Sequence, residues 1–407
     1  MLQILYFAQD LADPAVRRRV MMLAAGGAKV RLAGFRRGTN PLATTEGIEP
    51  IELGFTHDGR FLQRIGAVAR TRLSLKQSLR GVERPDLIVA RNLDMLAIAR
   101  KAAGIFGSDV PVVYECLDIH RLLLRPDTVG RTLRASEAFL GRDVRLLITS
   151  SPAFVEHYFR PLSGIAAPMM LLENKVLELD QTTARPTVPL AVPPKDGPWR
   201  IGWFGALRCR RSLALLSAFS RLMDGRFEIV LRGRPAYSEF DDFDEFVRNE
   251  PFMQFHGPYQ SPEELAVVYE DVHFTWAIDF FEQGKNSKWL LPNRLYEGCR
   301  YGRVPIALRG TETARFLAIR GLGMLLDEPA PEALAALVGA ITPERYTDAS
   351  RRIAACAPET WIFNRSDCED LVRRLAAAAT ASPPLTQKRR TRRPRSTPTP
   401  QNEGGLS

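Results

Sequence analysis

One glycine- and arginine-rich segment of the chain has the residue types that hold phosphate. Residues 202–212 read G-W-F-G-A-L-R-C-R-R-S and follow an apolar run. Gly205 would let the backbone approach a ligand closely, and Ser212 could cap a helix that begins here. Arg208 and Arg211 could then neutralise a phosphate bound at the helix N-terminus. The same pattern also occurs as a plain connection between a strand and a helix.

A second candidate is a single acid, Glu297, within the stretch W-L-L-P-N-R-L-Y-E-G-C-R-Y-G-R-V-P-I-A-L at residues 289–308. Pro292 can open a helix in this stretch, and Gly302 can end it with a left-handed cap. A lone carboxylate in basic, partly apolar surroundings can accept hydrogen bonds from sugar hydroxyls. Pairing with a neighbouring arginine at the surface is the alternative.

Several other chemistries lack their residues. The first predicted strand is followed by A-Q-D-L-A-D-P rather than by the glycine pattern of a dinucleotide site, and no G-x-x-x-x-G-K-[ST] is present. The five histidines are dispersed, so we expect no metal site. The five cysteines form no C-x-x-C pair, which favours reduced thiols in a cytosolic protein.

Short apolar runs alternate with helical patterns along most of the chain, and this order predicts parallel sheets covered by helices on both faces. Asp13 followed by Pro14 predicts a helix start after the first strand. A proline-rich stretch without periodicity divides the alternation into two halves. We therefore predict two doubly wound, Rossmann-like α/β domains that face each other across a cleft. Their expected bounds are 1–177 and 199–377, with a linker at 178–198 and a disordered basic tail at 378–407.

Positive charge is concentrated in two places. Residues 60–80 contain six arginines and lysines, no acid, and apolar residues at helical spacing. Such a basic amphipathic helix can lie on an anionic membrane surface, or it can be a solvated outer helix. The other place is the tail, which holds half of the net charge of +10 and lacks the apolar residues needed to fold. The sequence shows no secretory signal and no apolar run of about 18 residues. We expect a cytoplasmic protein, at most peripheral on the inner face of the cytoplasmic membrane.

These features together resemble the GT-B glycosyltransferases of glycosyltransferase families 1 and 4. The resemblance rests on two α/β domains, the loop after Gly202, and P-N-R-L-Y-E-G-x-x-Y-G-x-V-P-I near the end. The chain is most similar to the succinoglycan-type exopolysaccharide glycosyltransferases. This closer resemblance rests on two more segments, Y-E-C-L-D-I-H at 114–120 and I-D-F-F-E-Q-G-K-N-S-K-W at 278–289. The resemblance covers about residues 1–375.

The resemblance implies a nucleoside-diphosphate sugar, expected to be a UDP-sugar, as the donor. Its ribose hydroxyls would bind the acid that corresponds to Glu297, and its diphosphate would bind the glycine-and-arginine loop. The implied donor-binding residues are Gly205, Arg208, Arg211, Lys288, Asn293, Arg294 and Glu297, with Asn286 close by. Retaining members carry another acid eight positions before the equivalent of Glu297, where this chain has Trp289. Glu282 does not have that spacing, which leaves an inverting mechanism open.

An inverting transfer needs a base that removes a proton from the acceptor hydroxyl. Asp118 and His120 follow a predicted strand of the first domain, two residues apart, and would both face the cleft if the segment is extended. We expect Asp118 to be the base and His120 to orient it or to contact the donor. The alternative is that Asp118 caps the next helix and a backbone group satisfies His120. Asp13 and Arg17 are further candidates on the acceptor side.

The leading hypothesis is a hexosyltransferase that transfers a sugar to a lipid-linked saccharide, with the helix at 60–80 placing it on the membrane. It would need no metal and no cofactor if arginines and helix dipoles neutralise the leaving diphosphate. One alternative is a nucleotide-sugar epimerase of the same fold, which would need no acceptor. Another is a non-catalytic scaffold that binds membrane or RNA through its basic segments, although nucleic-acid binding is not expected of the folded part.

Overall fold

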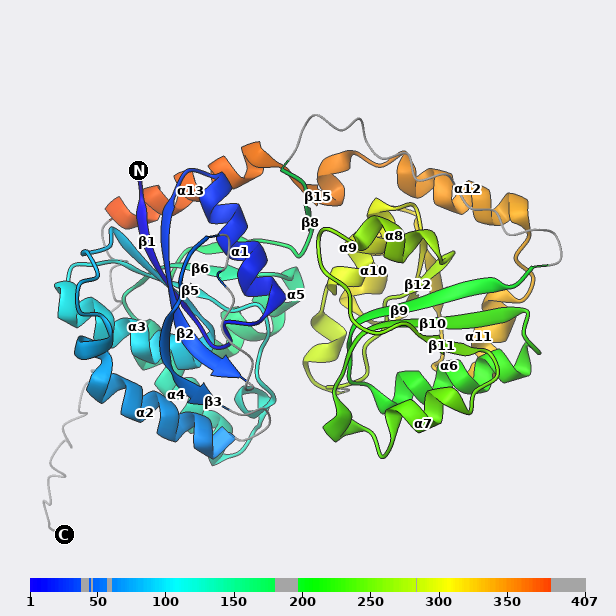
Figure 1. Cartoon of the computed structure of the whole chain (residues 1–407), viewed down its shortest axis with the longest axis horizontal. Helices are drawn as coiled ribbons and strands as arrows, with labels where there is room; N and C mark the ends of the chain where they lie inside the picture. The colour runs from blue at the N-terminus through cyan, green and yellow to red at the C-terminus, as the bar shows by residue number, and fades with distance from the viewer. Residues whose placement is uncertain (38–43, 45–46, 57–60, 180–196, 283, 382–407) are drawn as a thin grey trace, which may run out of the picture.

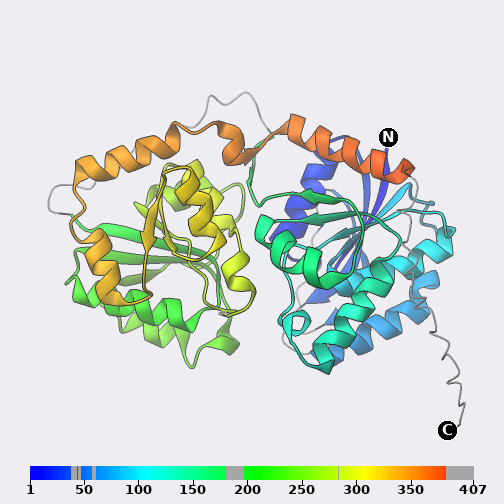
Figure 2. The same ribbon diagram turned by 180° about the vertical axis from the view of Figure 1, so that it is seen from behind.

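The computed structural model describes residues 1–37, 44, 47–56, 61–179, 197–282 and 284–381. These residues form two α/β domains that stand side by side and face each other (Figures 1 and 2). Most of the linker expected at 178–198, and the tail from residue 382 onward, lie outside the described residues, as does Arg60. The predicted architecture of two α/β domains with parallel sheets is confirmed.

The first domain is built on a parallel sheet of seven strands. In spatial order the strands are β3 (Ile51–Thr56), β2 (Lys29–Arg37), β1 (Gln3–Ala8), β4 (Leu87–Arg91), β5 (Val112–Glu115), β6 (Val144–Thr149) and β7 (Met169–Leu171). All residues of β4 are buried, as is typical of parallel strands that are covered on both faces. The sequence analysis missed β3, an edge strand whose sequence I-E-L-G-F-T contains a glycine and is only partly buried.

Helices cover both faces of this sheet. They are α1 (Pro14–Ala25), α2 (Phe61–Ser78), α3 (Asn92–Phe106), α4 (Thr128–Gly141) and α5 (Pro152–Phe154), with a 3-10 turn η1 (Arg121–Leu124) and a π-helical segment η2 (Val155–Ser163). The predicted start of α1 is confirmed, because the Asp13 side chain accepts a hydrogen bond from the Ala15 N–H at 2.9 Å. One apolar cluster joins α2 and α3 to the sheet, and another joins α1 to the opposite face.

The second domain repeats the plan with six parallel strands. In spatial order they are β11 (Met253–Phe255), β10 (Phe227–Pro235), β9 (Trp199–Leu207), β12 (Phe274–Trp276), β13 (Val304–Leu308) and β14 (Met324–Leu326). Its helices are α6 (Arg210–Leu222), α7 (Phe243–Arg248), α8 (Leu265–Glu270), α9 (Asn293–Arg300), α10 (Glu312–Ile319), α11 (Pro331–Val338) and α12 (Pro343–Ala354). Short 3-10 turns are η3 (Tyr237–Glu239), η4 (Asn286–Trp289) and η5 (Pro358–Thr360).

The end of the chain returns to the first domain. Helix α13 (Arg365–Thr380) packs against α1, β4 and β6 through an apolar stripe that includes Leu371 and Leu375, and Figure 2 shows it lying across the first domain. Just before it, β15 (Ile362–Phe363) pairs with β8 (Val176–Leu177), the last strand before the linker. The boundary expected at residue 377 is therefore corrected, because the apolar face of α13 completes the first core. The helix also extends past residue 378, where the tail was expected to begin.

Both sheets direct the carboxyl ends of their strands toward the space between the domains. The chain reverses its direction of strand addition at β1 and β4 in the first sheet, and at β9 and β12 in the second. Ligands of doubly wound sheets bind at such switch points. The segments that follow β1, β5, β9, β10 and β12 are therefore the places where functional side chains are expected.

Candidate functional site

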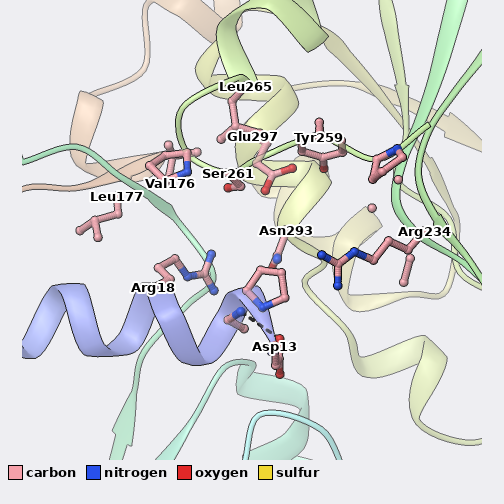
Figure 3. A pocket seen from close by; sticks show the side chains of 17 residues that line it. Asp13, Arg18, Val176, Leu177, Arg234, Tyr259, Ser261, Leu265, Asn293 and Glu297 are labelled. Atoms are coloured by element: carbon pink, nitrogen blue, oxygen red, sulfur yellow. Dashed lines mark hydrogen bonds between the residues drawn. The ribbon is translucent and has the colours of Figure 1, made fainter. Parts of the chain in front are cut away.

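A pocket of about 270 Å³ lies between the two domains (Figure 3). Residues of α1 and β8 form one wall, and residues at the ends of β9 and β10 and the start of α9 form the other. The lining residues are Asp13, Pro14, Ala15, Arg18, Val176, Leu177, Gly205, Ala206, Gly233, Arg234, Pro258, Tyr259, Ser261, Pro262, Leu265, Asn293 and Glu297. The pocket brings together four residues selected from the sequence, namely Asp13, Gly205, Asn293 and Glu297.

Glu297 is the acid of this pocket. It lies in the second turn of α9 and is buried, with its carboxylate directed toward the pocket in Figure 3. Its Oε2 accepts a hydrogen bond from the Tyr269 hydroxyl at 2.9 Å. Burial raises the pKa of Glu297, and the Tyr269 hydrogen bond and the charge of Arg18 oppose that rise. Among the residues that the structure describes, none donates a hydrogen bond to the other carboxylate oxygen, which is therefore available to a ligand hydroxyl.

Two glycines bring the backbone of neighbouring strands close together at the floor of the pocket. Gly205 in β9 and Gly233 in β10 are directly paired, with φ of +100° and +134°. A Cβ at Gly233 would lie 1.9 Å from the carbonyl oxygen of Gly205, so no other residue fits there. A Cβ at Gly205 would meet no atom within 4 Å, which leaves that side of the strand open to a ligand.

The positive charges of the pocket are Arg18 and Arg234, and the sequence analysis missed both. They extend into the pocket from opposite walls in Figure 3, Arg18 from α1 and Arg234 from the end of β10. Arg18 is held by the Asn174 side chain at 3.0 Å, and burial lowers its pKa to about 10, so it stays cationic at neutral pH. Asn293 begins α9 between them, where the helix N-terminus favours an anion. The available signal for Arg234 was the sequence R-G-R at the end of β10, the strand that pairs with Gly205.

The expected donor residues Arg208 and Arg211 do not line this pocket. Arg208 lies 3.7 Å from Asp279 and over the ring of Phe281, and Arg211 lies over the ring of Phe280. The helix cap also differs from the expectation. Helix α6 begins at Arg210, and Cys209 rather than Ser212 caps it. Ser212 is buried, and its hydroxyl accepts a hydrogen bond from the Trp276 ring N–H at 3.1 Å instead.

Arg294 and Lys288 also lie outside the pocket. The buried guanidinium of Arg294 donates to the carbonyl oxygen of Ile278 at 2.7 Å, which fixes the loop after β12 to α9. Lys288 is in η4 and lines a different cavity of the interface. The sequence pattern could not separate these roles because all of these cations lie within a few residues of Glu297 or Gly205.

Asp118 faces the second domain in the middle of the interface. Its Oδ1 accepts a hydrogen bond from the Asn286 side-chain amide at 2.8 Å, and the same amide donates to the Ile119 carbonyl at 2.6 Å. The Asp118 side chain is exposed to solvent but lies where the two domains meet. Partial desolvation, together with the negative charges of Asp279 and Glu282, raises the pKa of Asp118 to about 6, although Arg208 lowers it. A carboxylate with that pKa is mostly ionised at pH 7 and can accept a proton.

His120 has a local structural contact. It caps η1, and its Nδ1 accepts a hydrogen bond from the Leu122 N–H at 3.3 Å. This agrees with the alternative in which backbone satisfies His120. Asp118 accepts a hydrogen bond from Asn286 of the opposite domain, which orients its carboxylate.

Asp13 and Arg17 lie at the start of α1, but they differ in what they contact. Asp13 lines the pocket and is 3.5 Å from Arg91, which also binds the fully buried Glu115. Arg17 crosses to the second domain, where it donates to Glu263 at 2.8 Å and to the Ser261 carbonyl at 3.2 Å. Arg17 therefore joins the domains at the rim of the pocket, and its expected acceptor-side role stays a prediction.

The residues that the structure describes contain no group of three or more His, Cys, Asp or Glu that could hold a metal ion. None of the helices in the described ranges is long and apolar enough to cross a membrane.

Comparison with known proteins places this fold in a class. No family model matches the chain. The structure of sucrose-phosphate synthase from Thermosynechococcus elongatus is similar with a TM-score of 0.67 at 16% identity, covering 93% of this chain and 100% of that chain. Anabaena HepE, solved in complex with UDP and glucose, has a TM-score of 0.63 at 15% identity, with the same coverage. These similarities show the GT-B fold, in which two Rossmann-like domains face each other with a pocket between their strand ends.

The sequence relationship is much closer. The chain is 68% identical over 384 residues to the succinoglycan biosynthesis protein ExoL of Rhizobium meliloti (strain 1021), covering 94% of this chain and 95% of that protein. The chain therefore belongs to the same family as ExoL.

Proposed function

We propose that this glycosyltransferase moves a hexose from a UDP-sugar to a lipid-linked saccharide during exopolysaccharide synthesis. The observation that carries the donor assignment is that Glu297, Arg18 and Arg234 all line one interdomain pocket. A carboxylate suits the ribose hydroxyls, and two guanidinium groups suit a diphosphate. HepE, which shares the fold, binds UDP and glucose, and ExoL is a protein of succinoglycan synthesis. Both relationships support the proposal.

In the proposed reaction Asp118 removes the proton from the acceptor hydroxyl as this hydroxyl attacks the anomeric carbon. Asn286 holds the carboxylate through its amide at 2.8 Å, so the base is oriented by the domain that carries the donor. Arg18, Arg234 and the N-terminus of α9 would neutralise the charge that develops on the leaving diphosphate. These groups supply positive charge without a metal ion or another cofactor.

The diphosphate assignment predicts that Arg18 and Arg234 distinguish UDP from uridine. Changing either residue to alanine is expected to weaken UDP binding about 10–100-fold, since a hydrogen bond to a charged group contributes about 1.5–3 kcal/mol. Uridine binding should change little because uridine has no phosphate. Isothermal titration of both ligands measures the difference. Arg210→Ala, which removes a cation from the second domain outside the pocket, is the matched control. Equal losses for UDP and uridine would contradict the assignment.

We further propose that the exposed side of α2 contacts an anionic membrane. Thr71 and Leu75 of α2, and Leu79 just after it, are buried against the first domain, whereas Leu73 is 88% exposed. Most of the described apolar side chains of this segment therefore belong to the core, and the outward face carries Arg70, Arg72 and Lys76. Basic residues of this kind attract anionic lipid by about 1 kcal/mol each.

Neighbouring helices extend this basic surface. A groove beside α2 is lined by Arg72, Arg100, Lys101 and Arg142, and Phe139 is 61% exposed at its edge. The Arg142 guanidinium lies 4.4 Å from the centre of the Phe139 ring. Asp143 pairs with Arg100 at 2.6 Å and removes part of the charge. An exposed aromatic ring among cations suits the lipid headgroup region.

Reversing three charges tests the membrane assignment. The triple change Arg70→Glu, Arg72→Glu and Lys76→Glu is expected to lower the partition coefficient of the protein for phosphatidylglycerol vesicles about 100-fold. Vesicle sedimentation measures this coefficient. Binding of UDP in solution should be unchanged. A triple reversal at Arg345, Arg351 and Arg352 of α12 in the second domain is the control. Wild-type sedimentation by the α2 variant would place the membrane contact elsewhere.

A further inference from the structure

A second cavity, of about 570 Å³, lies between the domains on the other side of the η4 segment. It shares no lining residue with the pocket around Glu297, here called the nucleotide pocket after its proposed ligand. The first domain contributes Glu156 and His157 from η2, and the second contributes Lys288, Trp289, Arg309 and Arg315. The cavity therefore exists only where both domains meet.

Aromatic rings from the two domains form a layered surface in this cavity. The rings of His157 and Trp289 are stacked, with centroids 5.4 Å apart and an angle of 24° between the planes. His157 is exposed and Trp289 is half-buried. The ring of Phe154 supports Trp289 edge-on at 6.5 Å. A flat ring with apolar C–H groups could pack on such a surface through dispersion contacts.

The backbone beneath this surface is fixed from both domains. The Ser151 hydroxyl of the first domain donates a hydrogen bond to the carbonyl oxygen of Trp289. The Thr313 hydroxyl of α10 donates to the carbonyl of Leu290 at 2.9 Å. A surface that is held in place before a ligand arrives loses little entropy when it binds.

The polar groups around the rings carry both signs of charge. Glu312 and Arg315 form a bidentate pair with both distances at 2.7 Å, and Glu156 and Lys288 are exposed nearby. Mixed charge gives no preference for a strongly anionic or cationic ligand. It suits neutral hydroxyl groups, which can donate to carboxylates and accept from guanidinium groups in the same contact.

One short segment connects this cavity to the rest of the interface. Within residues 286–293, Asn286 binds Asp118, Trp289 lines the second cavity, and Asn293 lines the nucleotide pocket. We infer that the second cavity binds the terminal sugars of the acceptor saccharide, with one sugar ring packed against the surface formed by His157 and Trp289. This inference rests on the proposed transferase function. It gives Trp289 a role as part of an acceptor surface in the position where retaining relatives carry an acid.

Binding of a neutral trisaccharide to the full-length protein tests the inference. With cellotriose as the probe and UDP present, saturation-transfer NMR should detect binding to the wild type. His157→Ala should weaken this binding roughly ten-fold through loss of the stacking surface, and Arg315→Ala should also weaken it. Tyr237→Ala removes a 58%-exposed aromatic ring elsewhere on the second domain and is the matched control.

Each result supports or overturns a distinct statement. Absence of wild-type cellotriose binding, or equal binding by the wild type and both variants, overturns the acceptor cavity. The thermal shift caused by UDP should be the same in the wild type, His157→Ala and Arg315→Ala. Failure of UDP to stabilise any of them, with trisaccharide binding intact, would count against the proposed donor and leave the cavity standing.

Discussion

Changing Asp118 to asparagine is expected to lower kcat about 10²–10⁴-fold, because the variant keeps the shape of the side chain and loses the proton acceptor. The Asn286 amide donates to Asp118 Oδ1 in the structure, and the asparagine oxygen could still accept this bond, so the interface should remain formed. Affinity for UDP should therefore be unchanged. Product formation from a UDP-sugar and a lipid-linked acceptor is the measurement. Activity near the wild-type level would remove Asp118 from the chemistry.

The same residue sets the pH dependence. Partial desolvation raises the pKa of Asp118 to about 6, and only the ionised form can act as a base. Wild-type kcat should therefore be constant above this pKa and fall about ten-fold per pH unit well below it. The residual activity of Asp118→Asn should not show this fall in kcat at low pH. Asp109→Asn, at an exposed carboxylate paired with Arg84 in the same domain, should keep both the rate and the profile.

Changing Glu297 to glutamine is expected to weaken UDP binding about 100-fold. The carboxylate would lose charge-assisted hydrogen bonds to the ribose hydroxyls, each of which contributes about 1.5–3 kcal/mol. Folding should not suffer, because burial raises the pKa of Glu297 and the folded protein therefore disfavours its charge. Glutamine removes that charge while retaining an oxygen for the Tyr269 hydroxyl. Titration calorimetry gives the affinity, and thermal unfolding reports the fold.

A ligand lacking one hydroxyl tests this contact directly. If Glu297 binds the ribose 2′-hydroxyl, wild-type protein should bind 2′-deoxy-UDP less tightly than UDP, and Glu297→Gln should discriminate little between them. Glu228→Gln changes a carboxylate that pairs with Arg200 at 3.0 Å outside the pocket, and it should bind UDP normally. If the wild type and Glu297→Gln prefer UDP over 2′-deoxy-UDP to the same extent, Glu297 does not bind the 2′-hydroxyl.

The sequence predicts the architecture well because each buried strand must be apolar throughout and each helix start needs a particular cap. The sequence predicts an apolar first strand and a helix start at Asp13, and the structure has both, as β1 (Gln3–Ala8) and the cap of α1. The edge strand β3 was missed because one side of it needs no apolar cover. Helix α13 was assigned to the wrong domain because its apolar stripe indicates only that it packs, and not against which core.

The pocket was harder to predict because it joins residues that are far apart in the chain. Glu297 and Gly205 carry local patterns, and both line the pocket. Arg18 has no local sequence pattern that indicates a site, because an arginine in α1 becomes part of the pocket only when the domains face each other. Arg294 was misplaced for the opposite reason, because a cation three residues from Glu297 on a helix can face the core, as its bond to the Ile278 carbonyl shows.

The return of α13 to the first domain has a consequence for synthesis of the chain on the ribosome. The first domain lacks its last helix until residue 380 has been made, although its sheet is complete at residue 171. At about 5–20 residues per second, the apolar surface that α13 covers stays open for roughly 10–40 s while the second domain is translated. We therefore expect chaperones to bind the nascent first domain during this interval, because its last helix is made only after the second domain.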